Sequence, residues 1–244
     1  MRALILAAGR GSRLGALTDE RPKGLVEVCG RSLIAWQLEA LRSAGVEEVA
    51  IVRGYLGHAF PFETTYFENP RWAETSIVAS LACAEAWLAA GPTLVSYADI
   101  VYSPDAVRRL RYAPGDVAIA YDTRWLALWR QRFEDPLSDA ETFRVDAAGV
   151  LQEIGRRPAS LEEVRGQYMG LLKLTPRGAG KLLARFRALD AHDADRLDVT
   201  ALLDLLVGEG EGIRTVPFDG WWCEVDSSSD LRVAEEILER RPPA

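Results

Sequence analysis

An apolar segment near the start of the chain runs directly into a loop of glycines and cations. Leu4–Ala8 leads into Gly9-Arg10-Gly11-Ser12-Arg13, and Pro22-Lys23 follows a few residues later. Backbone amides in such a loop point together at a phosphate, small residues let the chain approach it closely, and cations neutralise its charge. The pattern therefore predicts a cradle for a nucleoside triphosphate.

Two other phosphate-binding motifs do not fit these residues. The dinucleotide fingerprint requires Gly-x-Gly-x-x-Gly and an acidic residue after the second strand. Here the third glycine is replaced by Leu14, and the second predicted strand ends in Arg53-Gly54. A P-loop requires Gly-Lys-Ser or Gly-Lys-Thr, and the chain contains neither.

Two aspartates stand where a predicted strand ends. Asp99 follows the apolar segment 94–97, and Asp226 ends the segment 221–225 and precedes a helix. An acid in this position either caps the next turn or holds a metal ion. Because ligands bind beyond the carboxyl ends of the strands in a parallel sheet, we expect Asp99 to lie near the N-terminal loop.

The hydrophobic pattern predicts an α/β fold, a Rossmann-like three-layer α/β/α arrangement around a mostly parallel sheet. In the first half, strands alternate with helices; the strands are expected at 3–7, 48–52, 94–97 and 117–121, and the helices at 32–43, 75–89 and 104–110. In the second half, strands are expected at 141–145, 150–154, 167–174, 213–217 and 221–225, and helices at 177–189, 198–206 and 229–240.

We expect a single domain over residues 1–244. Its nucleotide-binding half covers about 1–122, and an inserted acceptor-binding or lid region covers about 123–244.

Composition narrows the possible partners. The chain has 244 residues, of which 48% are hydrophobic, so it can bury a sizeable core. Its net charge of −7 argues against a general nucleic-acid binder. The three cysteines are far apart without metal-binding spacing, which indicates reduced thiols in a cytoplasmic protein. No segment approaches the length of a membrane span, and a homodimer is left open.

Together, the N-terminal loop, the distal Pro-Lys, Asp99 and the segment Trp222-Cys223-Glu224-Val225-Asp226 resemble the nucleotidyltransferases that join an NTP to a sugar phosphate, phosphocholine or a phosphonate. The resemblance implies that Asp99 and Asp226 jointly bind Mg²⁺, an ion that prefers oxygen ligands. In such a reaction, Lys23 would contact the α-phosphate, and Arg13 would hold the β- and γ-phosphates. Asp230 is expected to cap the last helix instead.

The resemblance also implies CTP as the nucleotide. The segment 66–81 is similar to the Asn-Pro…Thr-Asn…Ser-Leu stretch of phosphocholine and phosphonate cytidylyltransferases, except that Ser76 replaces an asparagine. Ser80 would contact the base, although a helix-face serine without a ligand is an equal alternative. The expected nucleotide-binding residues are Leu6, Ala7, Ala8, Gly9, Arg10, Gly11, Ser12 and Ser80.

The expected reaction needs no general base. A phosphate or phosphonate oxygen of the acceptor is already anionic when it attacks the α-phosphorus and displaces pyrophosphate. His58 and His192 are the two histidines of the chain, and neither stands in a catalytic context. The reaction requires alignment and neutralisation of charge, which Mg²⁺, Lys23 and Arg13 would supply.

Residues 124–132 suggest the acceptor. Arg124, Arg132 and Lys173 would pair with an acidic acceptor, whereas Trp125 and Trp129 would either stack on a quaternary ammonium or belong to the core. The arginines favour a small anionic acceptor such as phosphonoformate or aminoethylphosphonate over phosphocholine. Two alternatives stay open: a sugar-1-phosphate nucleotidylyltransferase that uses UTP, dTTP or GTP, and a regulator that binds a nucleotide without turnover.

Overall fold

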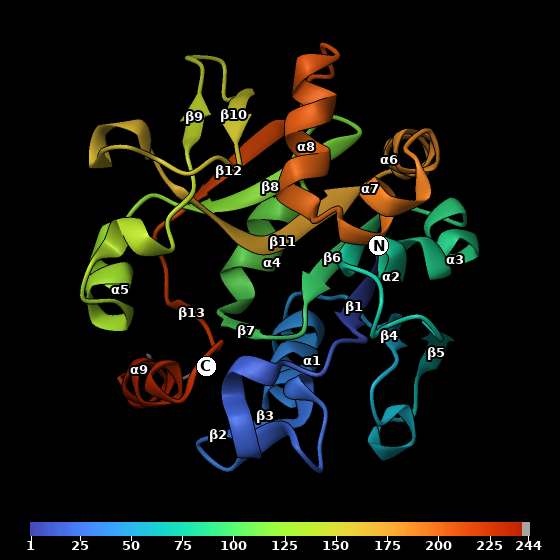
Figure 1. Cartoon of the computed structure of the whole chain (residues 1–244), viewed down its shortest axis with the longest axis vertical. Coiled ribbons are helices and arrows are strands. Elements are labelled where there is room, and N and C mark those ends of the chain that lie inside the picture. The colour runs from blue at the N-terminus through green and yellow to red at the C-terminus, as the bar shows by residue number, and fades with distance from the viewer. Residues whose placement is uncertain (241–244) are drawn as a thin grey trace.

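The computed structural model describes residues 1–240, and a seven-stranded sheet crosses the middle of the molecule (Figure 1). The strands follow the order β12-β8-β11-β6-β1-β4-β5 across the sheet. They are β1 (Arg2–Ala7), β4 (Val49–Arg53), β5 (Thr65–Glu68), β6 (Thr93–Tyr97), β8 (Val117–Asp122), β11 (Gln167–Leu174) and β12 (Arg214–Phe218). Every strand runs parallel to β1 except β11, so the predicted mostly parallel sheet is confirmed.

Helices cover both faces of this sheet, which confirms the three layers. One side carries α1 (Leu33–Ser43), α4 (Pro104–Arg111), α5 (Trp125–Arg132) and α9 (Ser228–Glu239). The other side carries α2 (Ile77–Cys83), α3 (Glu85–Ala89), α6 (Pro176–Arg187) and α8 (Val199–Gly208), with α7 (Ala191–Arg196) beside α2. Strand β1 alternates between the two cores: Ile5 faces the first, and Leu4 and Leu6 face the second.

The single helix predicted over 75–89 is two helices, α2 and α3. The break lies at Ala84, whose φ of −103° and ψ of 24° leave the helical region. Val78 and Leu81 before the break and Leu88 after it are buried in the same core. Apolar periodicity therefore continues across the break and could not reveal it.

Strand β11 lies in the middle of the sheet and runs against both neighbours. Leu171 pairs with Ser96, and Lys173 pairs with Leu94. The beginning of β11 therefore lies at the edge where β6 ends, and Lys173 lies toward the opposite edge. A run of apolar residues predicts a strand buried on both faces but not its direction.

Three short ladders complete the fold. They pair β2 (Glu27–Val28) with β3 (Arg31–Ser32), β7 (Ile100–Tyr102) with β13 (Trp222–Glu224), and β9 (Phe143–Val145) with β10 (Leu151–Ile154). Short 3₁₀ helices are η1 (Ser12–Thr18), η2 (Lys23–Leu25), η3 (Gly57–Ala59), η4 (Pro136–Ser138) and η5 (Leu161–Glu163). Within residues 1–240, no helix combines the length and apolar character that crossing a bilayer requires.

Candidate active site

The loop after β1 is folded around the side chain of Lys23. Gly11 has a φ of +75°, and a Cβ atom at this position would lie 2.7 Å from the Cβ of Lys23. Glycine alone accepts this left-handed conformation at such close approach. The Thr18 hydroxyl donates to the carbonyls of Gly11, at 3.2 Å, and Gly15, at 3.1 Å, and so ties the loop to η1.

Comparing two glycine substitutions tests this arrangement. We expect Gly11→Ala to lower turnover strongly, because its methyl group would displace the Lys23 stem. Gly15→Ala is the matched control: Gly15 also has a positive φ, but a methyl group there would meet no atom of residues 1–240 within 4 Å. That variant should lose about 1–3 kcal/mol of stability through backbone strain while keeping most of its kcat. Equal losses of kcat in both variants would contradict the packing role of Gly11.

Lys23 connects the two aspartates that the sequence singled out. Its Nζ donates to Oδ2 of Asp99 at 2.6 Å and also to Oδ1 of Asp226. The ladder between β7 and β13 brings the acids together, because Glu224 pairs with Ile100 and the Val225 amide donates to the Asp99 carbonyl at 2.8 Å. The chain thus places two acids separated by 127 positions (226 − 99) on one cation.

Electrostatics favour the charged form of this lysine. Burial alone would lower the pKa of Lys23, but the carboxylates of Asp99 and Asp226 outweigh that effect and raise its pKa above the ordinary value. Arg13 adds a second cation, since its guanidinium lies 3.0 Å from Oδ2 of Asp226. Arg13 is largely exposed, so its guanidinium has room to reach a phosphate.

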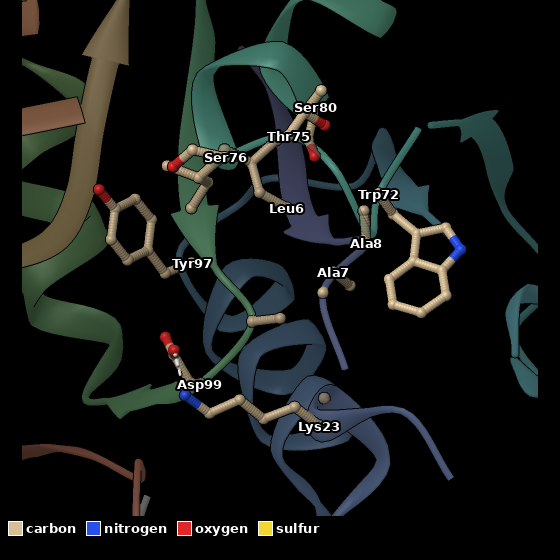
Figure 2. Close-up of a pocket in the computed structure, with 14 residues that line it drawn as sticks. Leu6, Ala7, Ala8, Lys23, Trp72, Thr75, Ser76, Ser80, Tyr97 and Asp99 are labelled. Carbon is tan, nitrogen blue, oxygen red and sulfur yellow. Dashed lines mark hydrogen bonds and ion pairs between the residues drawn. The ribbon is translucent and has the colours of Figure 1, made fainter. Parts of the chain in front are cut away.

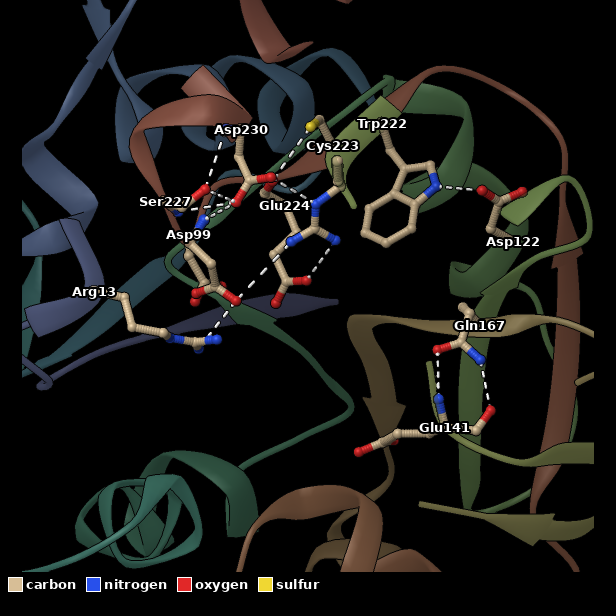
Figure 3. Close-up of polar contacts among 12 residues, drawn as sticks. Arg13, Asp99, Asp122, Glu141, Gln167, Trp222, Cys223, Glu224, Ser227 and Asp230 are labelled. Carbon is tan, nitrogen blue, oxygen red and sulfur yellow. Dashed lines mark hydrogen bonds and ion pairs between the residues drawn. The ribbon is translucent and has the colours of Figure 1, made fainter. Parts of the chain in front are cut away.

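A third carboxylate joins the two aspartates. Oxygen atoms of Asp99, Glu224 and Asp226 lie within 4.8 Å of one another (Figure 3). Burial and the nearby Asp226 raise the pKa of Glu224, while Arg132 opposes this effect. Glu224 is not among the residues selected from the sequence. Strand alternation places residues two apart on the same face, so the Glu-x-Asp spacing would have been a usable signal.

Arg132 lies behind this carboxylate cluster with a fully buried side chain. Its guanidinium lies 3.0 Å from both Glu224 and Asp230, and 4.0 Å from Asp226. Burial alone would lower the pKa of Arg132, but the charges of Glu224 and Asp230 outweigh that effect and raise its pKa above the ordinary value. Asp230 also forms a capping box with Ser227 at the start of α9, which confirms its predicted role as a cap.

The first cavity lies between the N-terminal loop and α2, above Lys23 and Asp99 (Figure 2). Five of the expected nucleotide-binding residues line it: Leu6, Ala7, Ala8, Gly9 and Ser80. Its wall also contains Trp72, Thr75 and Tyr97, which were not expected as ligands from the sequence. Trp72 and Tyr97 stand on opposite sides of the cavity. Ser80 is buried and accepts a hydrogen bond from Asn69 at 3.0 Å.

Three expected nucleotide-binding residues lie outside this cavity lining. Arg10 is exposed and pairs with Asp19 at 2.6 Å. Gly11 packs on Lys23, and Ser12 begins η1. The loop turns back after Gly9, which directs this part of the chain toward Lys23 and η1.

The second cavity opens on the other side of the cluster. The carboxylate cluster contributes Glu224 and Asp226, and the beginning of β11 contributes Tyr168. Tyr97 lines both cavities. The site therefore consists of two cavities that meet at a group of acids and cations.

Glu141 lies in the second cavity, and Gln167 holds its backbone. The Gln167 side chain accepts from the Glu141 amide at 3.2 Å and donates to the Glu141 carbonyl at 2.7 Å (Figure 3). Burial, assisted by the charges of Asp198 and Asp139, raises the pKa of Glu141 to about 7, while a hydrogen bond from Thr200 opposes the shift.

This shift predicts a pH-dependent effect on stability. Because the pKa of Glu141 is raised in the folded protein, this group costs little stability below its ordinary pKa and destabilises the fold increasingly as pH rises to about 7. Asp139, Asp198 and Tyr168 are the titratable groups coupled to it. We expect Glu141→Gln to raise the free energy of unfolding at pH 8 by at most about 3 kcal/mol, and by little at pH 5. Urea titrations at both pH values would show this, and an equal gain at both would contradict it.

Comparison with known proteins shows the family of this chain. Residues 3–161, more than half of the chain, match the family model described as a MobA-like NTP transferase domain. The chain belongs to this family. It is 35% identical to the CTP:phosphoglutamine cytidylyltransferase of Campylobacter jejuni, over 97% of this chain and 100% of that protein.

Two further similarities extend across the transferase chain. It is 34% identical to the CMP-5'-(3-aminopropyl)phosphonate synthase of Streptomyces rubellomurinus, over 96% of this chain but 38% of that protein. The solved CTP:phosphocholine cytidylyltransferase of Streptococcus pneumoniae has a TM-score of 0.73 at 23% identity, over 97% of this chain and 98% of that one, and so shares its fold.

The carboxylates of this transferase fit a hard divalent cation. Asp99, Glu224 and Asp226 offer oxygen ligands, which Mg²⁺ prefers. Oδ1 of Asp99 is buried and has no hydrogen-bond partner within residues 1–240. A cation would satisfy this oxygen, whereas a purely structural ion pair with Lys23 leaves it without a partner.

Most of the residues expected to bind the acceptor lie elsewhere. Trp129 lines the second cavity, but Arg132 is enclosed behind the carboxylates. Trp125 belongs to the core. Arg124 is exposed in a separate depression beside Trp221, and the buried Lys173 donates to the Ala113 carbonyl. The antiparallel direction of β11 explains the position of Lys173, since the end of that strand points away from the site.

Proposed function

We propose that this transferase is a Mg²⁺-dependent cytidylyltransferase, which moves CMP from CTP to a small phosphate or phosphonate acceptor and releases pyrophosphate. The observation that carries the proposal is the position of the acid and cation cluster between two cavities. Lys23 and Asp99 line the first cavity, and Arg13, Glu224 and Asp226 line the second. Two substrates held in these cavities would meet at the cluster, as group transfer requires.

The two cavities are formed by different parts of the chain. The first is formed entirely by residues between Leu6 and Asp99, whereas the second draws mainly on residues after position 122. We therefore assign the nucleotide to the first cavity and the acceptor to the second. CTP is proposed because relatives of this chain, including the C. jejuni protein that it matches over its full length, are cytidylyltransferases.

The chemistry follows from charge. An acceptor oxyanion forms a bond to the α-phosphorus, and the bond between the α-phosphorus and the bridging oxygen breaks, so that pyrophosphate leaves. In this proposal Lys23 holds the α-phosphate. Arg13 lines the second cavity and not the first, so we assign it to an anion of the acceptor in place of the β- and γ-phosphates expected from the sequence. When bound at Asp99, Glu224 and Asp226, Mg²⁺ would neutralise phosphate charge. No protein base is required, because the nucleophile is already ionised.

Pyrophosphate release is the decisive measurement. Each of CTP, UTP, dTTP and GTP is incubated with Mg²⁺ and one acceptor from a panel of aminoalkylphosphonates, phosphocholine, phosphonoformate and hexose 1-phosphates. We expect release with CTP and a phosphonate or phosphate monoester, and its loss when EDTA removes the metal. Release with UTP or dTTP and a hexose 1-phosphate would indicate a sugar nucleotidylyltransferase. Binding of nucleotides without any release would indicate a regulator.

A further inference from the structure

The second cavity carries more negative charge than its neighbours balance. Asp139, Glu141 and Asp198 line it, and none of the three forms an ion pair among residues 1–240, although the charges of Arg132 and Arg13 act on Asp139 from a greater distance. Glu224 and Asp226, in the same cavity, are paired with Arg132 and Lys23. Asp139 and Glu141 are partly buried, whereas Asp198 is exposed. A partly buried carboxylate without a cation is costly, because burial penalises its charge.

Glu141 and Asp198 share one hydrogen-bond donor. The Thr200 hydroxyl lies 3.2 Å from Oε1 of Glu141 and 3.1 Å from Oδ1 of Asp198, and it has a single proton to donate. Within residues 1–240, Oε2 of Glu141 and Oδ2 of Asp198 accept no hydrogen bond. The pair therefore has free acceptor capacity for a donor with several N–H groups.

Glu141 is separate from the reacting cluster. In Figure 3, Glu141 and Gln167 lie apart from Asp99 and Arg13. Glu141 nevertheless shares the second cavity with Glu224 and Asp226. An acceptor could therefore place its phosphoryl group beside Arg13 while another part of the molecule lies near Glu141.

Four aromatic side chains, those of Tyr97, Trp129, Tyr168 and Trp222, also line this cavity, but a quaternary ammonium held by them has no N–H to donate to Glu141 or Asp198. The Arg132 guanidinium already lies 5.0 Å from the centroid of the Trp129 ring, and Trp129 packs against Trp125 and Trp222. A carboxylate on the acceptor would meet like charges here, which is unfavourable. A hydrogen-bonding cation satisfies the oxygens of Glu141 and Asp198 better than either alternative.

On the basis of the proposed function, we infer that the acceptor carries a primary ammonium group, which binds between Glu141 and Asp198 while its phosphate or phosphonate lies near Arg13. Of the two acceptors that the sequence suggested, this selects the aminoalkylphosphonate over phosphonoformate. Burial and the charge of Asp198 raise the pKa of Glu141, so its negative charge is costly there and a bound ammonium group would offset that cost.

Matched acceptor pairs test the inference. With CTP and Mg²⁺, kcat/KM is compared between 2-aminoethylphosphonate and ethylphosphonate, and between 3-aminopropylphosphonate and propylphosphonate. We expect the amine of at least one pair to be preferred by about tenfold or more, the effect of one charge-assisted hydrogen bond. Glu141→Gln and Asp198→Asn should each abolish most of this preference. Both amides can still accept hydrogen bonds, so the start of α8 keeps its Asp198 cap.

Glu162→Gln is the control variant, since Glu162 is exposed and lies outside both cavities. It should keep the full preference for the amine. Glu141→Gln should change kcat/KM for the alkylphosphonates far less than for the amines. Equal use of amine and alkyl acceptors, a preference for phosphonoformate or phosphocholine, or an unchanged preference in Glu141→Gln would each overturn the inference.

Equilibrium binding separates this inference from the proposed function. Calorimetric titration of the same acceptor pairs into protein with Mg²⁺ and α,β-methylene CTP needs no turnover. Selective binding of the amines without pyrophosphate release would support the inference and refute cytidylyl transfer. Transfer without selectivity for the amine would support cytidylyl transfer and refute the inference. Binding without selectivity and without transfer would overturn both.

Discussion

Replacing Lys23 with alanine is expected to lower kcat with CTP and an accepted phosphonate by about 100- to 1,000-fold. The reason is the position of Nζ, which lies between Asp99 and Asp226 at the junction of the two cavities. A buried cation at this point would hold an α-phosphate while negative charge moves to the departing pyrophosphate. Single-turnover measurements with saturating CTP and Mg²⁺ would separate this loss from weaker substrate binding.

The same substitution should have an opposite effect on metal binding. Nζ of Lys23 occupies the position between two carboxylates that a cation would share. Removing it leaves Asp99, Glu224 and Asp226 facing one another without this charge, so Lys23→Ala should be less stable without metal and should bind Mg²⁺ more tightly. Thermal unfolding at increasing Mg²⁺ concentrations would show a larger gain in Tm for the variant than for the natural protein.

Lys181→Ala provides the matched control for both effects. Lys181 lies on α6, pairs with Glu211, and lines neither cavity. It should change neither kcat nor the Mg²⁺ dependence of Tm. Near-normal turnover in Lys23→Ala would refute the catalytic assignment, and an unchanged response to Mg²⁺ would show that the acids do not form a cation site.

The parts of the site that the sequence predicted well are those with a local chemical signature. The turn at Gly9–Gly11 and the acid at Asp99 each stand where an apolar strand ends, and parallel strands bring such ends to one edge. The meeting of Asp99 with Asp226 depends on the ladder between β7 and β13. That ladder is only three residues long, so the resemblance to a family, rather than periodicity, predicted it.

Two of the residues expected to bind the acceptor, Arg124 and Lys173, lie outside both cavities for a different reason. Arg124 and Lys173 were selected by their charge, but the charge of a residue does not predict at which edge of the sheet it lies. Because β11 runs antiparallel to β6, its last residues, including Lys173, lie at the edge of the sheet opposite to the site. Glu141, to which we assign the acceptor's ammonium group, was not selected because it stands at the start of a predicted strand with other carboxylates nearby, where a solvated acid is the ordinary interpretation.

Arg132 illustrates a third kind of error, in which the residue matters but its partner was misjudged. Its charge in the sequence suggests an anionic acceptor as the partner, and the structure places the guanidinium against Glu224 and Asp230. Both interpretations rest on the same positive charge. The packing of α5 against α9 determines whether the partner of Arg132 is an acceptor or a carboxylate of the protein. No local sequence pattern predicts that contact.

Arg132→Met is expected to lower the free energy of unfolding by about 3–5 kcal/mol, because removing one partner of a buried ion network leaves the others uncompensated. The Arg132 side chain is fully buried, so water cannot replace it beside Glu224 and Asp230. Methionine fills similar space without charge. Urea unfolding followed by tryptophan fluorescence would measure the loss. Arg130→Met is the control, since Arg130 is exposed on the same helix and should change stability by less than about 0.5 kcal/mol.

A double variant shows whether the loss comes from charge. Asp230→Asn keeps an oxygen for the capping box with Ser227 but removes one of the negative charges beside Arg132. If uncompensated charge causes the instability, Arg132→Met with Asp230→Asn should be more stable than Arg132→Met alone, although Asp230→Asn by itself should destabilise the natural protein. Additive losses would instead assign the effect of Arg132 to packing. Saturating Mg²⁺ should also restore part of the stability of Arg132→Met, because it would supply positive charge to Glu224 and Asp226.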